Sequence, residues 1–408
     1  MSDSDAGSVI DTVFDTDNHY WEPSDAFTRY RDPAFQDRGV TVGQLDGRSR
    51  YFVNGDLHPL LPGPGDVNPR PRPGALYDYF AGRSNREDVA HLLTCEDPAA
   101  HPEWFNRDAR LKTMDEQGLE ACWLFPSQGV CIEGPMQPDV EASMEVLRAF
   151  NRWIDDDWGF AYQNRIFAVP FFTLSDPDNA IAELEWALQR GARVAAIRPG
   201  PVFTKDGLKS PADPMYDPFW ARVAEANLVM TVHAGFEDGY QDVDDALARA
   251  WGYSSRRSAS STKILGFYEP FIEAVMHHRL IHDFFFALVT HKLFERHPAL
   301  RVASIENGAT WVPNLLRVLH IMHHRNPGWF AQDPTDQFKE NVWVAPFVED
   351  DVAELANYLP VERILFGSDW PHAEGMAHPK DFFANVASFT LDQQELIMRG
   401  NARKLMSG

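Results

Sequence analysis

The sequence carries eight short apolar runs, and helix-like segments separate most of them. Most of the runs are nearly continuous in hydrophobic residues, which is typical of parallel strands buried on both faces. Eight strands alternating with helices in 408 residues favour a closed parallel (β/α)8 TIM barrel over an open doubly wound sheet. No GxGxxG motif follows the first run, which argues against a dinucleotide-binding fold. The runs are residues 12–18, 121–127, 165–174, 194–200, 228–235, 301–307, 341–347 and 363–371.

Two of the segments between the runs have clear helix boundaries. After the third run, Ser175 or Asp176 can cap a helix that Gly191 ends. A second helix is predicted from Arg107 to a stop at Gly118. Both boundaries support the alternation of strands and helices.

The alternation is interrupted once, between the first and second runs. About ninety residues there are rich in Pro and Gly. Residues 39–55 read as a β-hairpin with its turn at LDG, and residues 61–74 predict no regular structure. Long insertions in barrels commonly serve as lids or interfaces. We therefore predict a flexible tail over 1–10 and one barrel domain over 11–408. Within that domain, 24–110 is expected to form a lid or dimer-contact arm.

Composition excludes some partners. The net charge is −23, whereas nucleic acids and anionic membranes require a basic surface, so neither is expected to bind. The longest apolar run is too short to span a bilayer, and the acidic N-terminus does not resemble a signal peptide. Three cysteines without CxxC spacing indicate reduced thiols in the cytoplasm.

Polar residues lie at the C-terminal ends of several runs. In a parallel barrel these ends face one common mouth. Three carboxylates and two imidazoles at one mouth form a mixed nitrogen and oxygen ligand set for a divalent metal. Asp15 alternates with the first two of these residues and is predicted to orient the neighbouring histidine. The residues are Asp17 and His19 at the end of the first run, Arg198 at that of the fourth, His233 at that of the fifth, Glu306 at that of the sixth and Asp369 at that of the eighth.

Four motifs carry a family resemblance: FDTDNHYWEP, TVHAG, HPALRVASIENGATWVP and ILFGSDWPHAEG. Together they resemble the amidohydrolase-related family (amidohydrolase family 2). The branch they resemble contains aminocarboxymuconate semialdehyde decarboxylase and γ-resorcylate decarboxylase. The resemblance extends over nearly the whole chain from about residue 11. It implies a (β/α)8 barrel with a metal at its mouth, and a homodimer.

The resemblance also implies roles for single residues. Asp17 and His19 match the family's metal-binding pair on the first strand, and His233 matches its histidine on the fifth. Asp369 matches the aspartate that binds metal and handles protons. Glu306 stands where the family usually has a histidine on the sixth strand. Glu306 is therefore expected to act as acid or base if burial raises its pKa, to bind the metal, or to serve structure alone.

Arg198 limits the number of metals. Binuclear members of the wider superfamily usually use a modified lysine at the end of the fourth strand, and arginine cannot replace it because it stays protonated. We therefore expect one divalent ion per chain, zinc first and manganese as the alternative. Arg198 could hold a substrate carboxylate or pair with a neighbouring acid. His372, just after the eighth run, is expected to contact the substrate or the metal.

Three functions are compatible with this reading. The first is a metal-dependent decarboxylase of an aromatic or unsaturated carboxylic acid, with Asp369 or Glu306 delivering a proton to the carbon that loses CO₂. The second is a hydrolase of an amide, lactone or related bond that uses a metal-activated water. The third is a non-catalytic barrel that binds a ligand.

Overall fold

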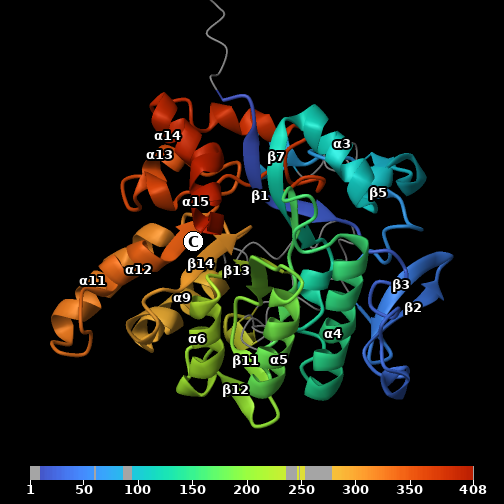
Figure 1. Ribbon diagram of the computed structural model, residues 1–408, viewed down its shortest axis with the longest axis horizontal. Helices are drawn as coiled ribbons and strands as arrows, with labels where there is room; N and C mark the ends of the chain where they lie inside the picture. Colours follow the sequence, from blue (N-terminus) through green and yellow to red (C-terminus); the bar gives the residue numbers. More distant parts are fainter. Residues whose placement is uncertain are drawn as a thin grey trace, which may run out of the picture.

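Parallel pairing of the predicted runs closes the barrel. The computed structural model describes residues 10–58, 61–85, 94–235, 246–247, 249–252 and 278–407. Its barrel strands are β1 (Val13–Tyr20), β7 (Leu119–Pro126), β8 (Ile166–Ala168), β9 (Phe171–Phe172), β10 (Val194–Ile197), β13 (Val229–His233), β14 (Arg301–Ile305) and β15 (Val342–Val344). Ladders run β1–β7–β8 and β9–β10–β13–β14–β15, and every pair is parallel. The predicted (β/α)8 barrel is confirmed (Figure 1).

The third predicted run is one extended segment that appears as two strands. Pro170 lies between β8 and β9 and has no N–H to donate to a ladder. Backbone bonds still join its neighbours: Val169 N donates to Leu124 O at 3.0 Å, and Ala196 N donates to Pro170 O at 2.9 Å. The segment therefore connects the two sheets across the break.

The eighth run closes the ring between β15 and β1. It pairs through isolated bridges, Val344 with Ile364 and Asn18 with Trp370. Thr16 N donates to Phe366 O at 2.9 Å, which ties this run to the middle of β1. Its ladder is irregular because Asp369 has a left-handed backbone, with φ of 56°.

The helices lie outside the strands, as Figure 1 shows for α4, α5, α6 and α9. Their boundaries follow the capping signals: Asp176 caps α5 through the Asn179 amide, and Gly118 ends α3 at φ of 72°. The α-helices are α1 (Tyr77–Phe80), α3 (Arg107–Gln117), α4 (Val140–Asp157), α5 (Pro177–Leu188), α6 (Asp217–Glu225), α9 (Arg279–Thr290), α10 (Leu293–Arg296), α11 (Val312–Arg325), α12 (Pro334–Asn341), α13 (Val352–Leu355), α14 (Leu391–Glu395) and α15 (Asn401–Ser407).

The insertion after β1 forms small antiparallel units. The predicted hairpin is present as β2 (Val40–Leu45) and β3 (Arg48–Val53), joined to the two-residue β4 (Asp56–Leu57). Residues 61–74 contain one short strand, β5 (Arg70–Pro71), which pairs with β6 (Cys95–Glu96). The prediction of no regular structure there is therefore wrong for two residues. Of the predicted tail, residues 1–9 lie outside the described residues.

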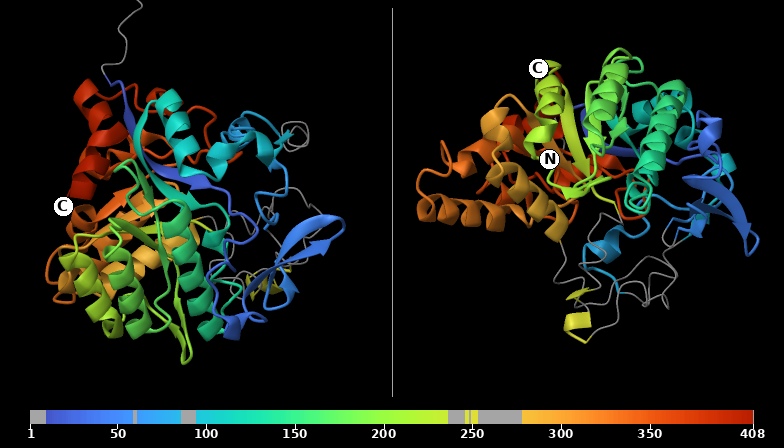
Figure 2. Two further views of the ribbon diagram at one scale, coloured as in Figure 1. Left: turned by 45° about the vertical axis from the view of Figure 1, so that its right-hand side comes forward. Right: turned by 90° about the horizontal axis from the view of Figure 1, so that it is seen from below.

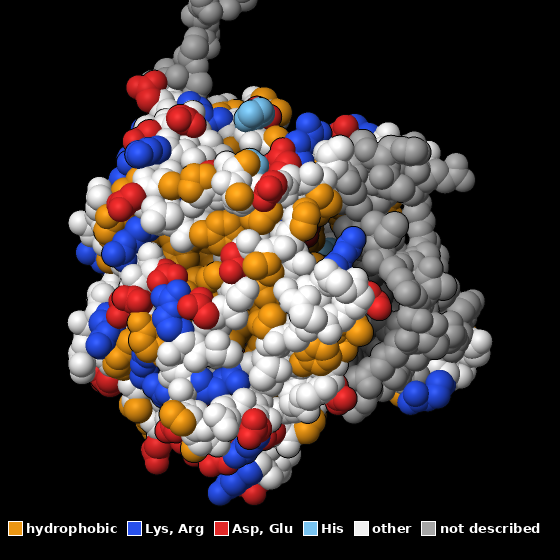
Figure 3. All heavy atoms as spheres, turned by 90° about the vertical axis from the view of Figure 1, so that its right-hand side faces the viewer, with side chains coloured by type: hydrophobic (Ala, Val, Ile, Leu, Met, Phe, Trp, Pro, Cys, Tyr) orange, Lys and Arg blue, Asp and Glu red, His pale blue; other side chains and the backbone are white. Residues whose placement is uncertain are grey.

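The insertion contacts the barrel in two places. Its first part packs on α4, where Arg38 binds Asp139 at 2.6 Å and the Asp32 amide donates to Glu145 at 2.7 Å. Figure 2 shows β2 and β3 projecting beyond this helix. On this side of the molecule, basic and acidic side chains are interspersed among hydrophobic ones (Figure 3).

A later part of the insertion reaches the barrel mouth. Gly74 N donates to His372 O at 3.0 Å, and Leu76 N donates to Ala373 O at 2.7 Å. These bonds join the insertion to the loop that follows the eighth run. Among the described residues, no helix is long and apolar enough to cross a bilayer.

Gly367 allows the eighth run to approach β1. A Cβ atom added there would lie 2.5 Å from the Asp17 Cβ. We predict that Gly367→Ala destabilises the protein by about 1–3 kcal/mol, the usual cost of overpacking. The thermal unfolding midpoint measures this effect.

A double-mutant cycle supplies the control. The Asp17→Gly background lacks the opposing Cβ, so Gly367→Ala should cost much less there. An equal loss of stability in both backgrounds would contradict the proposed clash.

Candidate metal centre

The end of β1 brings two of the predicted ligands into the site. The register between β1 and β7 shifts between Asp15 and Asn18, so the simple alternation along the strand breaks there. Asp17 and His19 converge on the mouth. Asp15 instead accepts hydrogen bonds from Ser368 and Asn18, and the ring of His19 meets the Pro126 carbonyl. The prediction that Asp15 orients His19 is therefore wrong.

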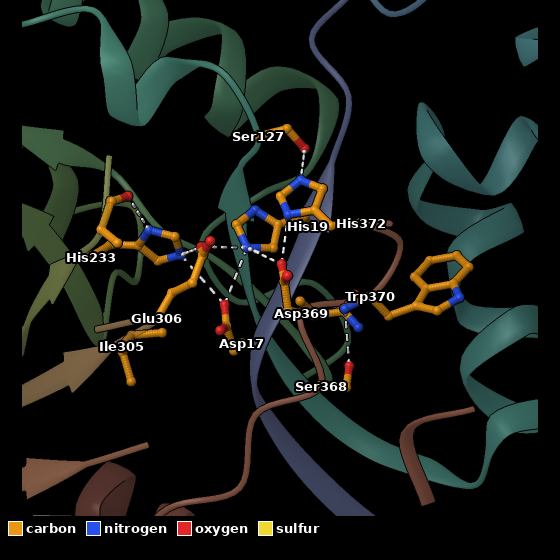
Figure 4. A network of polar contacts seen from close by, with 12 residues as sticks. Asp17, His19, Ser127, His233, Ile305, Glu306, Ser368, Asp369, Trp370 and His372 are labelled. Carbon is orange, nitrogen blue, oxygen red and sulfur yellow. Dashed lines mark hydrogen bonds and ion pairs between the residues drawn. The ribbon is translucent and has the colours of Figure 1, made fainter. Parts of the chain in front are cut away.

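The predicted side chains from four strand ends meet at one point (Figure 4). His19 Nε2 lies 3.1 Å from Asp17 Oδ1, 3.6 Å from Glu306 Oε2 and 3.4 Å from Asp369 Oδ1. His233 Nε2 lies 3.4 Å from Asp17 Oδ1 and 3.1 Å from Glu306 Oε2. Two groups of four have ligand atoms within 4.8 Å of one another: Asp17, His19, His233 and Glu306, and also His19, Glu306, Asp369 and His372.

The histidines of β1 and β13 have the hydrogen bonding expected of metal ligands. His19 Nδ1 lies 3.2 Å from Pro126 O, and His233 Nδ1 lies 2.8 Å from Ala234 O. A carbonyl oxygen can only accept, so each Nδ1 carries a hydrogen and each Nε2 faces the carboxyl groups. At 3.1–3.6 Å, an Nε2 lone pair and a carboxylate oxygen repel unless a proton or a cation lies between them. The donor set therefore fits a divalent metal ion.

Burial sets the charges of the metal-free site. It lowers the pKa of His19 to about 3, which keeps that imidazole neutral at pH 7. Burial also raises the pKa of Glu306 well above its usual value, and the nearby Asp369 and Asp17 act in the same direction. For Asp369, burial and then Glu374 raise the pKa. Without a cation, burial therefore favours the protonated forms of Glu306 and Asp369.

His372 is held beside Asp369 by a chain of hydrogen bonds. Its Nδ1 lies 2.5 Å from Asp369 Oδ1, and its Nε2 lies 2.7 Å from Ser127 Oγ. Ser127 donates its only hydroxyl hydrogen to the Tyr20 carbonyl at 2.6 Å, so its oxygen must accept from His372 Nε2–H. The contact between His372 and Asp369 then contains one proton, on either the ring or the carboxyl group.

The backbone is strained at two acidic residues of the site, one directly after β14 and one within the eighth run. Glu306 has φ of 55° and Asp369 has φ of 56°. Left-handed backbone in residues other than Gly costs about 1–3 kcal/mol and persists where its surroundings hold it. The strain lies at the two residues whose side chains enter the site.

Arg198 does not contact this cluster in any described interaction. It pairs with buried Glu133 at 3.6 Å and lies over the Phe203 ring at 4.2 Å. These contacts match the alternative of an ion pair with a neighbouring acid.

Two polar residues near the site were not predicted from the sequence. Ser127 follows β7 in the motif FPS, where a hydroxyl at a strand end was the available signal. Arg110 lies in α3 and donates to the His19 carbonyl at 2.7 Å. A basic residue in a helix carries no sequence signal for a buried contact of this kind.

We predict that His233→Ala reduces metal affinity by more than about a hundredfold. Substitution of a residue that only supports a ligand commonly reduces metal affinity by about 10–100-fold, and loss of a ligand itself should reduce it further. The matched control is His320→Ala on α11, whose side chain is 58% exposed. Elemental analysis and titration of Mn²⁺ into chelator-treated protein measure the difference. Equal affinity in both variants would remove His233 from the ligand set.

Metal binding should release protons. In the metal-free protein, the raised pKa values of Glu306 and Asp369 favour protonated carboxyl groups, and a cation that these groups bind displaces their protons. Affinity should therefore rise with pH. Calorimetry in buffers of different ionisation enthalpy counts the protons, and Glu306→Gln should release fewer. A pH-independent affinity would contradict this assignment.

Comparisons with known proteins agree with the fold. The amidohydrolase family matches residues 14–406. An amidohydrolase from Mycobacterium avium subsp. paratuberculosis is 38% identical, with a TM-score of 0.89, over 97% of this chain and 99% of its own. No curated protein matches.

More distant structures share the barrel. A 5-carboxyvanillate decarboxylase from Sphingomonas paucimobilis is 17% identical over 97% of this chain and 99% of its own, with a TM-score of 0.59. A dihydroxybenzoic acid decarboxylase from Polaromonas sp. JS666, with bound manganese and 2-nitroresorcinol, is 20% identical over 82% and 93%, with a TM-score of 0.56. The match along almost the whole chain identifies the protein as an enzyme of the amidohydrolase family.

Proposed function

We propose that the protein is a mononuclear metal-dependent decarboxylase of an aromatic or unsaturated carboxylic acid. His19, His233 and Asp17 would hold the ion, together with Asp369 or Glu306. A divalent cation bound there supplies positive charge that stabilises negative charge developing on the substrate. The proposal depends mainly on the single proton held between Asp369 and His372 beside this donor set.

Decarboxylation needs one proton at the reacting carbon. The bond from that carbon to the carboxylate breaks, its electron pair stays on the carbon, and CO₂ leaves. The carbon then takes up a proton, and no oxidant is consumed. Asp369, which shares a proton with His372 at 2.5 Å, is positioned to donate it. Glu306 is the alternative donor, since burial favours its protonated form.

The net charge of the metal site favours an anionic substrate only while some of its carboxyl groups carry protons. Three ionised carboxylates around one divalent ion would sum to −1 and would repel a carboxylate. A proton on Glu306 brings the sum to zero, and the proton shared by Asp369 and His372 makes it more favourable still. Acceptance of a carboxylic acid therefore requires that Glu306, or the pair of Asp369 and His372, keeps a proton after the ion binds.

The surroundings of the site also support a flat substrate. The ring of Trp21 lies 5.2 Å from that of His372. Arg198 is already paired with Glu133, so we assign the substrate carboxylate to the metal rather than to Arg198. The distant structural relatives that are decarboxylases of aromatic acids suggest which compounds to screen first.

We propose one ion per chain, either Zn or Mn. Imidazole nitrogens suit zinc, and the carboxylates suit manganese. Two neutral histidines with two ionised aspartates balance the charge of a divalent ion. The fourth strand offers Arg198 in place of a lysine that could bridge a second ion.

Hydrolysis is the second candidate, and the excess of carboxylates favours it. If Glu306, Asp17 and Asp369 are all ionised, a neutral amide or lactone is a better substrate than an anion. Asp369 would then accept a proton rather than donate one. The two reactions differ in their products, since only decarboxylation releases CO₂.

The first experiment combines metal content with a screen of substrates. Protein purified without chelators should contain about one equivalent of Zn or Mn per chain, and it should release CO₂ from some aromatic carboxylic acids. Two equivalents with turnover of lactones or amides would support hydrolysis. No metal, even after incubation with Zn²⁺ and Mn²⁺, would overturn both reactions.

We predict that Asp369→Asn abolishes turnover and leaves the fold intact, because an amide cannot share or donate the proton. Glu306→Gln should reduce turnover by at least about a hundredfold if Glu306 is the acid or base. Steady-state rates and circular dichroism test both variants. A rate for Asp369→Asn equal to that of the wild type would refute its role, and an unchanged rate for Glu306→Gln would leave Glu306 a structural residue.

A further inference from the structure

We infer that Arg110 is a positioning residue for the metal ligands and acts through a buried chain formed by Asn18, Asp15 and Ser368. None of these four residues is a proposed metal ligand. All four side chains are 0% exposed. The inference rests on the proposed metal centre, because it concerns how the ligands of that centre are placed.

Arg110 binds the backbone at the end of β1. Its Nη2 donates to the His19 carbonyl at 2.7 Å, and its Nη1 donates to Asn18 Oδ1. Its Nε donates to the Glu103 carbonyl at 2.8 Å. The guanidinium also lies over the Trp370 ring, 4.6 Å from the centroid. One side chain therefore fixes residues on both sides of the closure between β1 and the eighth run.

Asp15 continues the chain to the eighth run. Its Oδ2 accepts from Asn18 Nδ2 at 2.9 Å and from Ser368 Oγ at 2.6 Å. Its Oδ1 accepts from the Ser368 amide at 2.9 Å and from the Asp17 amide at 3.1 Å. The carboxylate thus binds the backbone of one proposed ligand, Asp17, and the residue directly before another, Asp369.

Arg110 and Asp15 are the two ionisable groups of the chain. Each is fully buried, and a buried charge is costly unless it is paired and hydrogen-bonded. Asn18 links them, because its oxygen accepts from Arg110 and its nitrogen donates to Asp15. Replacement of either end removes one of the two hydrogen bonds of the Asn18 side chain, so the chain should act as a unit.

The strained residue lies in the middle of this arrangement. Asp369 has φ of 56°, and strain of this kind needs support from its neighbours. Ser368 before it is bound to Asp15, and Trp370 after it lies beneath Arg110. The Asp369 amide donates to the Asp17 carbonyl at 2.8 Å. The chain therefore fixes the separation of Asp17 and Asp369.

Conservative variants test the inference through metal affinity. Arg110→Lys keeps a positive charge but lacks the planar fork of N–H groups that reaches three separate oxygens. Ser368→Ala removes one hydroxyl and is a second probe if the lysine variant does not fold. The matched control is Arg165→Lys, because Arg165 donates to the carbonyls of Glu120 and Leu119 at the opposite end of β7.

Titration of Mn²⁺ into chelator-treated protein measures affinity, and thermal unfolding of the same samples measures stability. We expect Arg110→Lys and Ser368→Ala to weaken Mn²⁺ binding by about 10–100-fold, the usual effect of residues that support ligands. Arg165→Lys should lower the unfolding midpoint without changing the affinity.

Three outcomes would overturn the inference. Affinities within twofold of the wild type in Ser368→Ala and in any folded Arg110→Lys would show that the chain does not position the ligands. An equal loss of affinity in Arg165→Lys would attribute the effect to general stability. Absence of Mn²⁺ binding by the wild type would overturn the proposed metal function together with this inference, whereas the first two outcomes would leave that function standing.

Discussion

The site depends on the closure of the barrel between β1 and the segment that follows β15. Backbone bonds make this closure, from Thr16 to Phe366, from Asp369 to Asp17 and from His19 to Trp370. The same residues supply three of the proposed metal ligands. In most parallel barrels the last strand completes the hydrogen bonding of the first. Here that junction also fixes the positions of Asp17, His19 and Asp369 relative to one another.

The junction is irregular, and the irregularity has a clear physical reason. A regular strand points successive side chains to opposite faces and residues two apart to the same face, so Asp15, Asp17 and His19 would all turn to the site. The register shift in β1 separates Asp15, which turns to Ser368, from Asp17 and His19, and Asp369 enters the site from a left-handed backbone. Ladder hydrogen bonds are lost there, and bonds from buried side chains such as Asp15 replace them. A less regular strand is thus compatible with a well-defined site.

Much of this arrangement could be predicted from the sequence. Apolar runs and capping residues identified the barrel, because buried parallel strands and helix ends leave local signals. The polar residues at strand ends identified Asp17, His19, His233, Glu306 and Asp369, because the barrel brings those ends together. The sequence could not show that Asp15 turns to Ser368, since that depends on a register shift. The buried partners of Arg110 and Arg198 depend on tertiary packing and leave no periodic pattern.

The position of His372 has a consequence for the supply of protons. Its outer nitrogen donates to Ser127, whose own hydrogen is committed to the Tyr20 carbonyl, and a carbonyl passes no proton onward. The hydrogen-bonded chain from Asp369 therefore ends at the partly exposed Ser127, which has no further hydrogen to pass on. If Asp369 donates its proton to the substrate, as proposed, that proton would have to be replaced from the mouth of the barrel. Protons and substrate would then enter by the same mouth, and the product would have to leave before Asp369 regains its proton.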